Sequence, residues 1–419
     1  MKDILIKSFI DIGEAMLECG SEVYRTEDSI HRMCKAYGAV HCDVYALTNI
    51  IQVTVQTPED DIITQIRYVR GNSTNFDRLI RLNSLCRFIT AERPSQPEIS
   101  RRFQEIMNLP DPPRWRRFLA AAMIMGGFTV FFGGTLVDGA IGAAIGLLIA
   151  LLDIFLGKVE NNEFVYNFEM AFVIGAAALG AWNVFPVLKP GMIIVGSIML
   201  LISALGFTNG IRCIFRGNFM SGSVKMLHAL VGAFAIASGI AVAMMLISYP
   251  THFSTHVNAN NAVYQLLSTT IGCMGLLIWQ KLRGVRVIAC AGLGAFLAWG
   301  TELIAMQYGA SAFYATMIAS VFTAFFSDIM ARWNRMPATI FLTSCMFALI
   351  PGANLYNFMN GILVRDSAFA LSNCVTMLKI ALAIALGFIV MNIIKKYVLM
   401  IQKLLRGEKI PDPKHTPWL

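Results

Sequence analysis

The sequence predicts a polytopic α-helical membrane protein, with ten transmembrane helices in a 5+5 inverted repeat and a small N-terminal cytosolic α+β domain. Three observations lead to this fold class. The 419 residues are 56% hydrophobic and only 14% charged, with a mean hydropathy of +0.60, whereas soluble proteins carry about 25% charged residues. Basic residues gather at alternate ends of the apolar segments, and the second half of the membrane region partly repeats the first.

Residues 1–112 have the pattern of a soluble α+β domain. A helical stripe of apolar residues runs from Leu5 to Cys19 and ends at Gly20, and Ser21 is placed to cap a second helix. Alternating apolar and polar residues then indicate strands. The sequence predicts three strands and a third helix, at about 40–47, 50–56, 62–69 and 76–90.

Ten apolar segments follow, each long enough to cross a bilayer. They run at about 117–137, 139–157, 166–186, 190–210, 228–249, 262–280, 286–305, 310–331, 337–359 and 374–396. Lys and Arg cluster at alternate loops, while the other loops hold only Lys189 and Arg365. Because cytoplasmic loops collect basic residues, we expect a multi-pass protein of the plasma or inner membrane with both termini cytoplasmic.

The two halves of the membrane region overlay at a shift of about 147 residues. Pro190 matches Pro337 and Ser197 matches Ser344. Each half has five spans, so the second is inserted upside down relative to the first, as in the inverted repeats of secondary transporters. The expected units are the first repeat, the second repeat and a cytosolic tail, at 113–250, 251–397 and 398–419.

One equivalent pair of spans combines glycine with asparagine at similar depth: the fourth, with the motif GFTNG, and the ninth, with PGANLY. Paired broken helices of this kind form the binding site in inverted-repeat transporters, and free N–H groups after Pro351-Gly352 would favour a substrate carboxylate. The alternative is a structural kink whose backbone groups neighbouring helices satisfy. The candidate substrate-binding residues are Thr208, Asn209, Pro351, Gly352, Asn354 and Tyr356.

Ionisable residues within membrane spans are costly and usually functional. Burial of a carboxyl group favours its protonated form, and a carboxyl that takes up and releases protons is what a proton-coupled carrier needs. The candidate coupling residues are Asp153, Glu302, Glu169 and Asp328. The alternative is that these residues lie near span ends, where they snorkel to the interface or pair with loop charges.

Several function classes are disfavoured by the sequence. The nine cysteines are scattered and form no metal-ligand pattern, so neither a metal nor a cofactor is expected. The net charge of +8 follows from basic loops and does not indicate nucleic-acid binding. No P-loop is present, which argues against an ATPase. Ser21, Asp28 and His31 share one helix face, but hydrolase triads are built from different elements, so we do not expect an enzyme.

Three stretches resemble the threonine/serine exporter family over nearly the whole chain. They are GSEVYRTEDSIHRMCKAYG (20–38), GFTNGIRCIFRGNFMSG (206–222) and MPATIFLTSCMFALIPGANLY (336–356). The resemblance is to the form in which two subunits, separate in some relatives, are fused. It implies proton-driven export of small hydroxy amino acids, and a split-subunit branch is associated with succinate export. Matching positions are Tyr24, Arg25, Glu27, Asn209, Gly217, Pro337, Pro351, Gly352 and Tyr356. The family often has an aspartate where this chain has Cys213.

We therefore expect a secondary transporter that exports threonine and serine, with protons and the lipid bilayer as its other partners and a homo-oligomer left open. A dicarboxylate exporter of the succinate type is the first alternative. The second alternative is a membrane-anchored enzyme or sensor with its site in residues 1–112. In this part of the chain Glu27 lies on an apolar stripe and needs a partner, which Arg25 or a membrane-proximal arginine could supply.

Overall fold

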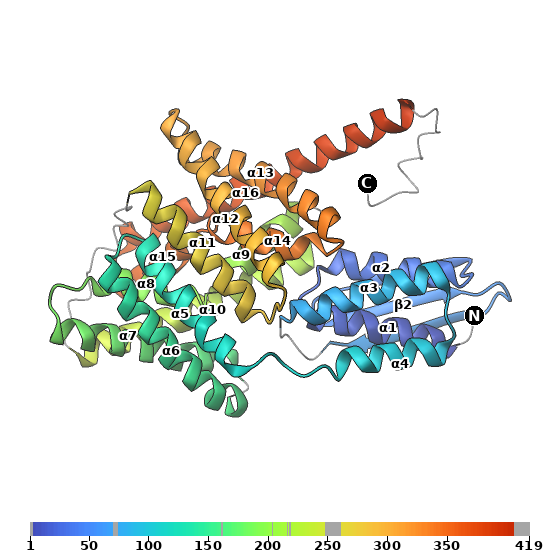
Figure 1. Ribbon diagram of the computed structural model, residues 1–419, viewed down its shortest axis with the longest axis horizontal. Helices are drawn as coiled ribbons and strands as arrows, with labels where there is room; N and C mark the ends of the chain where they lie inside the picture. Colours follow the sequence, from blue (N-terminus) through green and yellow to red (C-terminus); the bar gives the residue numbers. More distant parts are fainter. Residues whose placement is uncertain are drawn as a thin grey trace.

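The computed structural model describes residues 3–69, 74–160, 162–202, 204–215, 217, 219–247 and 261–405. An N-terminal unit of helices and strands lies beside a larger bundle of helices (Figure 1). The cytosolic tail expected at 398–419 falls outside the described residues from residue 406 onward.

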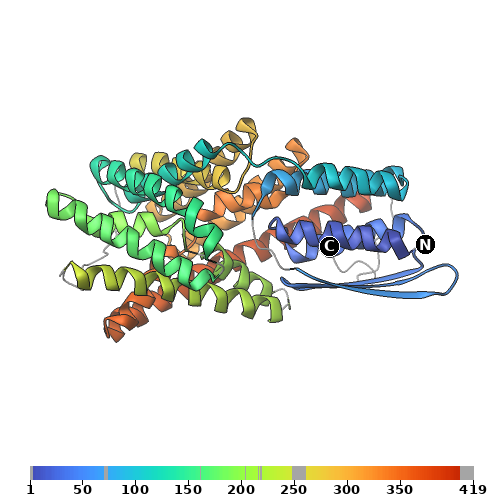
Figure 2. The same ribbon diagram turned by 90° about the horizontal axis from the view of Figure 1, so that it is seen from below.

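The N-terminal unit packs helices against one face of a small sheet. Its described elements are α1 (Asp3–Glu18), α2 (Val23–Ala36), β1 (His41–Ala46), β2 (Ile50–Gln56), β3 (Ile62–Tyr68), α3 (Phe76–Glu92) and α4 (Gln96–Met107). The strands pair antiparallel in the order β1-β2-β3. Figure 2 shows α1 lying along one face of this sheet. The strands predicted at about 40–47, 50–56 and 62–69 are confirmed as β1, β2 and β3, and the helix predicted at 76–90 is confirmed as α3.

Local sequence explains these elements, with two corrections. The α1 stripe and the alternate residues of β2 face each other in the core, where Phe9, Met16 and Val53 are fully buried. The prediction that Ser21 caps α2 is wrong, because the cap residue is Glu22 and the Ser21 hydroxyl instead donates to the Glu22 carbonyl (3.3 Å). The sequence did not predict α4, although its Ile99, Phe103, Ile106 and Met107 recur at helical spacing and pack on the core of the unit.

The bundle begins after a Pro-rich linker. Its described helices are α5 (Arg114–Phe131), α6 (Leu136–Val159), α7 (Glu163–Val184), α8 (Pro190–Ile198), α9 (Ala204–Phe215), α10 (Phe219–Leu246), α11 (Ala262–Trp279), α12 (Val285–Gln307), α13 (Ala312–Asn334), α14 (Ala338–Phe347), α15 (Gly352–Leu363) and α16 (Ser367–Leu405). The predicted fourth span is divided between α8 and α9, and the predicted ninth between α14 and α15.

The chain is a polytopic α-helical membrane protein. Within the described residues, seven helices are long and apolar enough to cross a membrane, and α14 with α15, bent by 56°, would form an eighth span. This count is below the ten expected for physical reasons. Helix α5 begins with three arginines, which shortens its apolar part, and α8 and α9 are each too short to span a bilayer alone.

Helix packing in the first half of the bundle has a counterpart in the second half. Helix α7 packs on α10 as α13 packs on α16, and α9 packs on α10 as α15 packs on α16. The halves also exchange contacts, since α10 touches α15 and α16 touches α9. Helices α5 and α11 pack extensively against each other, and they cross where a Cβ on Gly127 would lie 3.0 Å from the Gly272 nitrogen.

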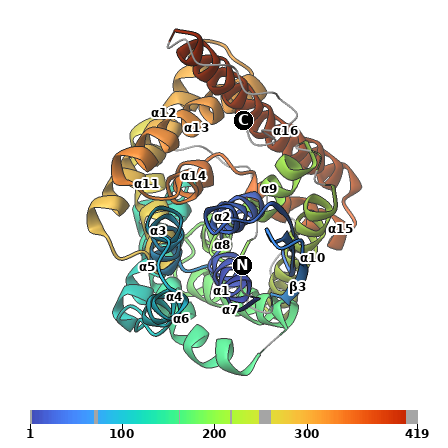
Figure 3. The same cartoon turned by 90° about the vertical axis from the view of Figure 1, so that its right-hand side faces the viewer.

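The N-terminal unit is docked on one end of the bundle. Its Phe76 N–H donates to the carbonyl of Gln280 (3.0 Å), and Arg87 donates to the carbonyl of Arg335 (2.8 Å). In the linker, Asp111 pairs with Lys281 (3.0 Å). The apolar core of the unit is continuous with the ends of α11 to α14. Viewed from the side of the unit, the bundle helices form a ring behind it (Figure 3).

Candidate functional site

The two broken segments of the bundle contact each other. A Cβ on Gly352, the first residue of α15, would lie 3.0 Å from the Met199 sulfur and 3.4 Å from Ile202 Cγ2. Met199 and Ile202 belong to the stretch between α8 and α9. The break at Pro351-Gly352, which the sequence identified, thus lies beside the break of the fourth span in the interior of the bundle. The fourth span is interrupted between α8 and α9, and the prediction of an interruption at the GFTNG motif is wrong, because this motif is helical within α9.

The α14–α15 break leaves backbone groups without partners. The Gly352 N–H donates to Ile350 (2.8 Å) and the Leu355 N–H to Pro351 (3.0 Å). Within the described part of the chain, the N–H groups of Ala353 and Asn354 have no acceptor. The start of α15 therefore offers two unpaired donors, in the segment where the sequence predicted them.

Polar side chains near the two breaks fall into two groups. Thr208 of α9 and Tyr356 of α15 are fully buried, and among the described residues neither hydroxyl has a hydrogen-bond partner. Asn354 and Asn357 instead both donate to the Oδ1 atom of Asn373 on α16, at 3.2 and 3.4 Å. Asn373 is not among the residues that the sequence predicted, although an amide side chain in the apolar sequence of α16 is a signal that could have identified it.

Of the remaining candidates for substrate binding, Pro351 is the cap residue of α15, directly before Gly352. Asn209 is half-buried on α9, one residue after Thr208. In the parts of the chain that the structure describes, the Asn209 amide makes no hydrogen bond. The six candidates therefore lie on the two segments that follow the breaks.

Two of the four candidate coupling carboxylates are ion-paired. Asp153 pairs with Arg117 and also accepts a hydrogen bond from the Tyr166 hydroxyl (2.6 Å). Asp328 pairs with Lys395. Asp153 and Asp328 therefore agree with the alternative interpretation, in which carboxylates near the ends of spans form ion pairs with basic residues.

The other two candidate carboxylates lack a cation in the described residues. Glu302 on α12 is 5% exposed and accepts a hydrogen bond from the Thr316 hydroxyl (2.9 Å). Its second oxygen, and Oε2 of the half-buried Glu169 on α7, are buried and have no donor there. Glu302 and Glu169 are therefore the two candidate carboxyl groups that have no counter-charge among the described residues.

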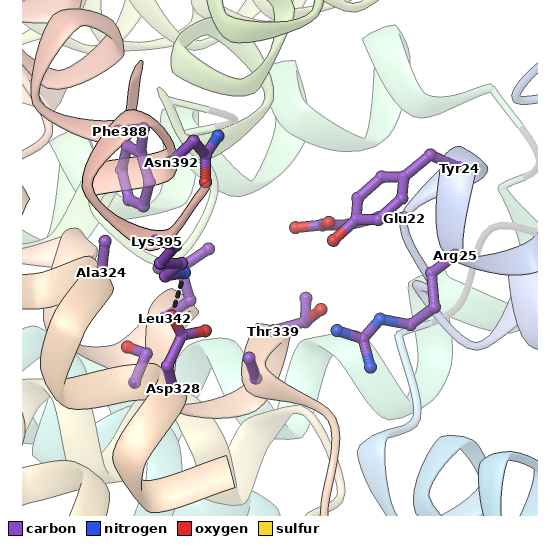
Figure 4. A pocket seen from close by; sticks show the side chains of 12 residues that line it. Glu22, Tyr24, Arg25, Ala324, Asp328, Thr339, Leu342, Phe388, Asn392 and Lys395 are labelled. Carbon is purple, nitrogen blue, oxygen red and sulfur yellow. Dashed lines mark ion pairs between the residues drawn. The ribbon is translucent and has the colours of Figure 1, made fainter. Parts of the chain in front are cut away.

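A pocket of about 80 Å³ lies between the N-terminal unit and the bundle. It is lined by the start of α2 and by residues of α13, α14 and α16: Glu22, Tyr24, Arg25, Ala324, Ser327, Asp328, Ala338, Thr339, Leu342, Phe388, Asn392 and Lys395. Figure 4 shows Tyr24 and Arg25 pointing across this pocket towards the wall that carries Asp328 and Lys395. Residues that the sequence analysis had assigned to separate groups thus share one pocket.

Family models match almost the whole chain. Residues 7–247 match the model described as "Putative threonine/serine exporter", and residues 265–394 match the one described as "Threonine/Serine exporter, ThrE". The chain belongs to the threonine/serine exporter family. The first match ends at residue 247 and the second begins at residue 265. The expected boundary between the two membrane repeats, at 250 and 251, falls between them.

Two curated relatives of this threonine/serine exporter family member are themselves described as threonine/serine exporters, and a third has another description. A "Probable threonine/serine exporter" of Mycobacterium tuberculosis is 24% identical over 378 residues, which cover 85% of this chain and 70% of that protein. The "Threonine/serine exporter" of Corynebacterium glutamicum is 23% identical over 401 residues, or 90% and 80% of the two chains. A "Pheromone-regulated membrane protein 10" of Debaryomyces hansenii is 22% identical over 285 residues, 61% of this chain and 28% of that protein. No solved structure matches.

One residue of the exporter-family signature faces away from the pocket. Glu27 accepts a hydrogen bond from the Ala46 N–H (2.8 Å) and so joins α2 to β1. The expectation that an arginine pairs with Glu27 is wrong, because the turn of the helix directs Arg25 to the pocket. Burial raises the pKa of the Glu27 carboxyl, and the Ala46 hydrogen bond opposes this rise.

The polar residues behind the hydrolase alternative do not form a triad in this exporter-family chain. Asp28 pairs with Arg32 (2.8 Å), and the His31 ring contacts the Cys42 carbonyl (3.1 Å). Ser21 bonds to its neighbour, as described above. At the position of the family aspartate, Cys213 is half-buried and its sulfur lies 4.0 Å from Lys225 Nζ.

Proposed function

We propose that the protein is a secondary transporter that exports threonine and serine, driven by the proton gradient. Membership of the exporter family gives the general activity. The observation that carries the proposal is the contact between the two helix breaks, where Gly352 packs on Met199 and Ile202. Binding between paired broken helices is the arrangement found in inverted-repeat transporters.

The mirrored helix contacts support a 5+5 inverted repeat with ten spans. In this arrangement α8 with α9 and α14 with α15 each count as one broken span, and α5 and α11 lie next to the pseudo-twofold axis. The exchange of partners, α10 with α15 and α16 with α9, is the pattern that a twofold axis produces. With five spans per half, the second half is inverted in the membrane.

The docking of the N-terminal unit supports its assignment to the cytosol. The unit binds the loops around Gln280 and Arg335, which carry the basic residues expected on the cytoplasmic side. Lys395, near the end of the last span, lies at the same interface. Both termini are then cytoplasmic and the protein is a multi-pass plasma-membrane protein.

The substrate site follows from the unpaired groups at the breaks. A carboxylate is favoured by free N–H groups at a helix start, which Ala353 and Asn354 supply. The buried hydroxyls of Thr208 and Tyr356 lack partners among the described residues and are suited to a substrate amino or hydroxyl group. Of the candidate coupling residues, Glu302 and Glu169 face no cation in the described chain and are proposed to carry the proton.

Uptake into proteoliposomes tests this function. Labelled serine, threonine and succinate are compared with and without an imposed proton gradient. We expect gradient-stimulated uptake of serine and threonine. Uptake of succinate without serine would favour the dicarboxylate alternative and contradict the proposal, and uptake unaffected by a proton ionophore would rule out the coupling.

The site is tested with substitutions that remove one hydroxyl group. Replacing an unpartnered buried hydroxyl with an isosteric apolar group is nearly neutral for stability, so an effect on affinity indicates a substrate contact. Thr208→Val and Tyr356→Phe are each expected to raise the KM about tenfold. Thr323→Val is the matched control, since Thr323 of α13 is also fully buried and its hydroxyl also lacks a partner among the described residues. Wild-type KM values in both test variants would place the site elsewhere.

A further inference from the structure

The pocket between α2 and the bundle is not used by the transport site proposed above. It lies at the docking interface, on the side of the N-terminal unit, whereas the helix breaks lie inside the bundle. Its walls come from two parts of the chain that lie some 300 residues apart in sequence: the start of α2, and the helices α13, α14 and α16. Its lining contains four charged side chains and four neutral hydrogen-bonding side chains.

Arg25 is the most informative residue of this pocket. Its Nε atom is buried, and among the described residues the Nε atom has no hydrogen-bond partner and the guanidinium makes no ion pair. Arg32 on the same helix, in contrast, pairs with Asp28 at 2.8 Å. A buried guanidinium donor without an acceptor is unfavourable. Because the guanidinium fork matches a carboxylate, the pocket is built to accept one.

The opposite wall supplies complementary polar groups. Asp328 and Lys395 form an ion pair there, and Figure 4 shows Thr339 between this pair and Arg25. Ser327 is 1% exposed, and its hydroxyl has no hydrogen-bond partner among the described residues. A ligand that reaches this wall would meet a carboxylate and two hydroxyl groups.

Charge and size restrict the ligand. Arg25 and Lys395 balance Glu22 and Asp328, so the ionisable side chains that line the pocket have no net formal charge. A zwitterion preserves this balance, whereas a dicarboxylate would add two negative charges in a partly desolvated site. A cavity of about 80 Å³ has room for several water molecules, which is comparable to a small amino acid.

We propose that this pocket is a second substrate site, in which Arg25 binds the α-carboxylate of a small neutral amino acid such as serine. Asp328 receives the ammonium group, and Ser327 or Thr339 bonds to the side-chain hydroxyl. This inference rests on the proposed export of amino acids. Because Arg25 belongs to the N-terminal unit and Asp328 to the bundle, the bound amino acid bridges the two parts on the proposed cytosolic side of the membrane.

A cysteine placed inside the pocket reports binding at this site alone. Asn392 is an exposed residue of α16 that lines the pocket, so Asn392→Cys should react with a small maleimide. In the purified full-length protein, serine is expected to slow this reaction. Serine amide, which lacks the carboxylate, and succinate are expected not to slow it. The modified peptide is quantified by mass spectrometry, which separates it from peptides with native cysteines.

The variants identify the carboxylate contact. Adding Arg25→Gln should raise the serine concentration for half-protection by roughly 10- to 100-fold, since a charged hydrogen-bond partner is lost. Arg32→Gln, on the same helix but outside the pocket, is the control and should leave protection unchanged. Ser327→Ala gives a second variant with little risk to folding and should weaken protection less.

The outcomes separate this site from the proposed function. Absence of serine protection at Asn392→Cys, in protein that transports serine, would overturn the second site alone. Equal protection in the Arg25→Gln and Arg32→Gln variants would overturn the role of Arg25. Protection that persists in protein unable to transport serine would count against the proposed function and support the binding site.

Discussion

A buried carboxylate is stabilised when a cation or several donors face it. Asp153 meets this condition through Arg117 and Tyr166, and the Arg117 guanidinium also stacks on Trp279 at 4.6 Å. Among the residues that the structure describes, Glu302 has only the Thr316 hydroxyl as a donor. These two carboxyl groups occupy nearly equivalent positions in the proposed repeat but have different surroundings. We expect the first to act in stability and the second in proton exchange.

This difference predicts opposite results for two neutralising substitutions. Asp153→Asn should lower the free energy of unfolding by about 1–3 kcal/mol, because it leaves Arg117 without its carboxylate. Glu302→Gln should fold normally, since its amide oxygen can still accept from Thr316, but should abolish the pH dependence of transport. Thermal unfolding in detergent and transport rates between acid and neutral pH measure the two effects.

The matched control for this prediction is the double variant Arg117→Gln/Asp153→Asn, which should recover part of the stability because no charge is left unpaired. A Glu302→Gln protein with the wild-type pH dependence would show that Glu302 is structural and that protons are carried elsewhere.

At the scale of elements, the bundle is held together by helices that approach closely at glycine. A Cβ on Gly196 of α8 would overlap the backbone nitrogen and Cα of Thr129 on α5, and a Cβ on Gly239 of α10 would overlap the Phe168 carbonyl on α7. Small residues allow such contacts between membrane helices, where the hydrophobic effect does not drive association. The position of α8, and with it the position of the break between α8 and α9, therefore depends on such close contacts at glycine.

A methyl group at one of these contacts should be destabilising. Gly196→Ala is expected to lower the free energy of unfolding by about 1–3 kcal/mol, because the α5 backbone must shift. Gly180→Ala on α7 is the control, since a Cβ there would have no other atom within 4 Å, and replacing a helical glycine with alanine stabilises by up to about 1 kcal/mol. Thermal unfolding in detergent compares them. Equal midpoints would show that α8 is not tightly packed on α5.

At the scale of the whole molecule, the N-terminal unit and the bundle share one continuous interface. Backbone hydrogen bonds, the linker ion pair and an apolar core that reaches α11 to α14 connect them. This extensive contact indicates that the unit acts together with the membrane helices. It also fixes the relative orientation of the loops, which gives the topology a direct test.

Cysteine labelling tests the membrane orientation. Val187, between α7 and α8, and Tyr308, between α12 and α13, are 85% and 89% exposed, and the proposed topology puts both outside. Glu59, exposed in the β2–β3 turn, should be cytosolic. In intact cells, a membrane-impermeant maleimide should modify Val187→Cys and Tyr308→Cys but not Glu59→Cys, with each peptide measured by mass spectrometry. Permeabilised cells are the control, in which all three should react. Labelling of Val187→Cys and Glu59→Cys from the same side would exclude the inverted arrangement.

The sequence by itself determined the membrane class, the strands of the N-terminal unit and the position of the helix break at Pro351-Gly352, but not that of the break between α8 and α9. These features depend on local properties: apolar length, alternation along a strand, and the missing N–H of Pro351 next to Gly352. The family signature was also present in the sequence. Helix α4 was not predicted because Pro94 and Pro97 resemble the end of a helix, whereas Pro97 lies in the first turn of α4, where proline is tolerated. The Ser21 cap was wrong because a hydroxyl can bond to its own neighbours.

Only the tertiary structure decided which side chains meet. Arg25 and Asp328 are some 300 residues apart, and no local pattern indicates that they share a pocket. The partner of Glu27, the pairing of Asp153 with Arg117 and the contact of Gly352 with Met199 likewise depend on how distant helices pack. Side-chain partners are set by three-dimensional packing, whereas the elements that carry them are set by neighbouring residues along the chain.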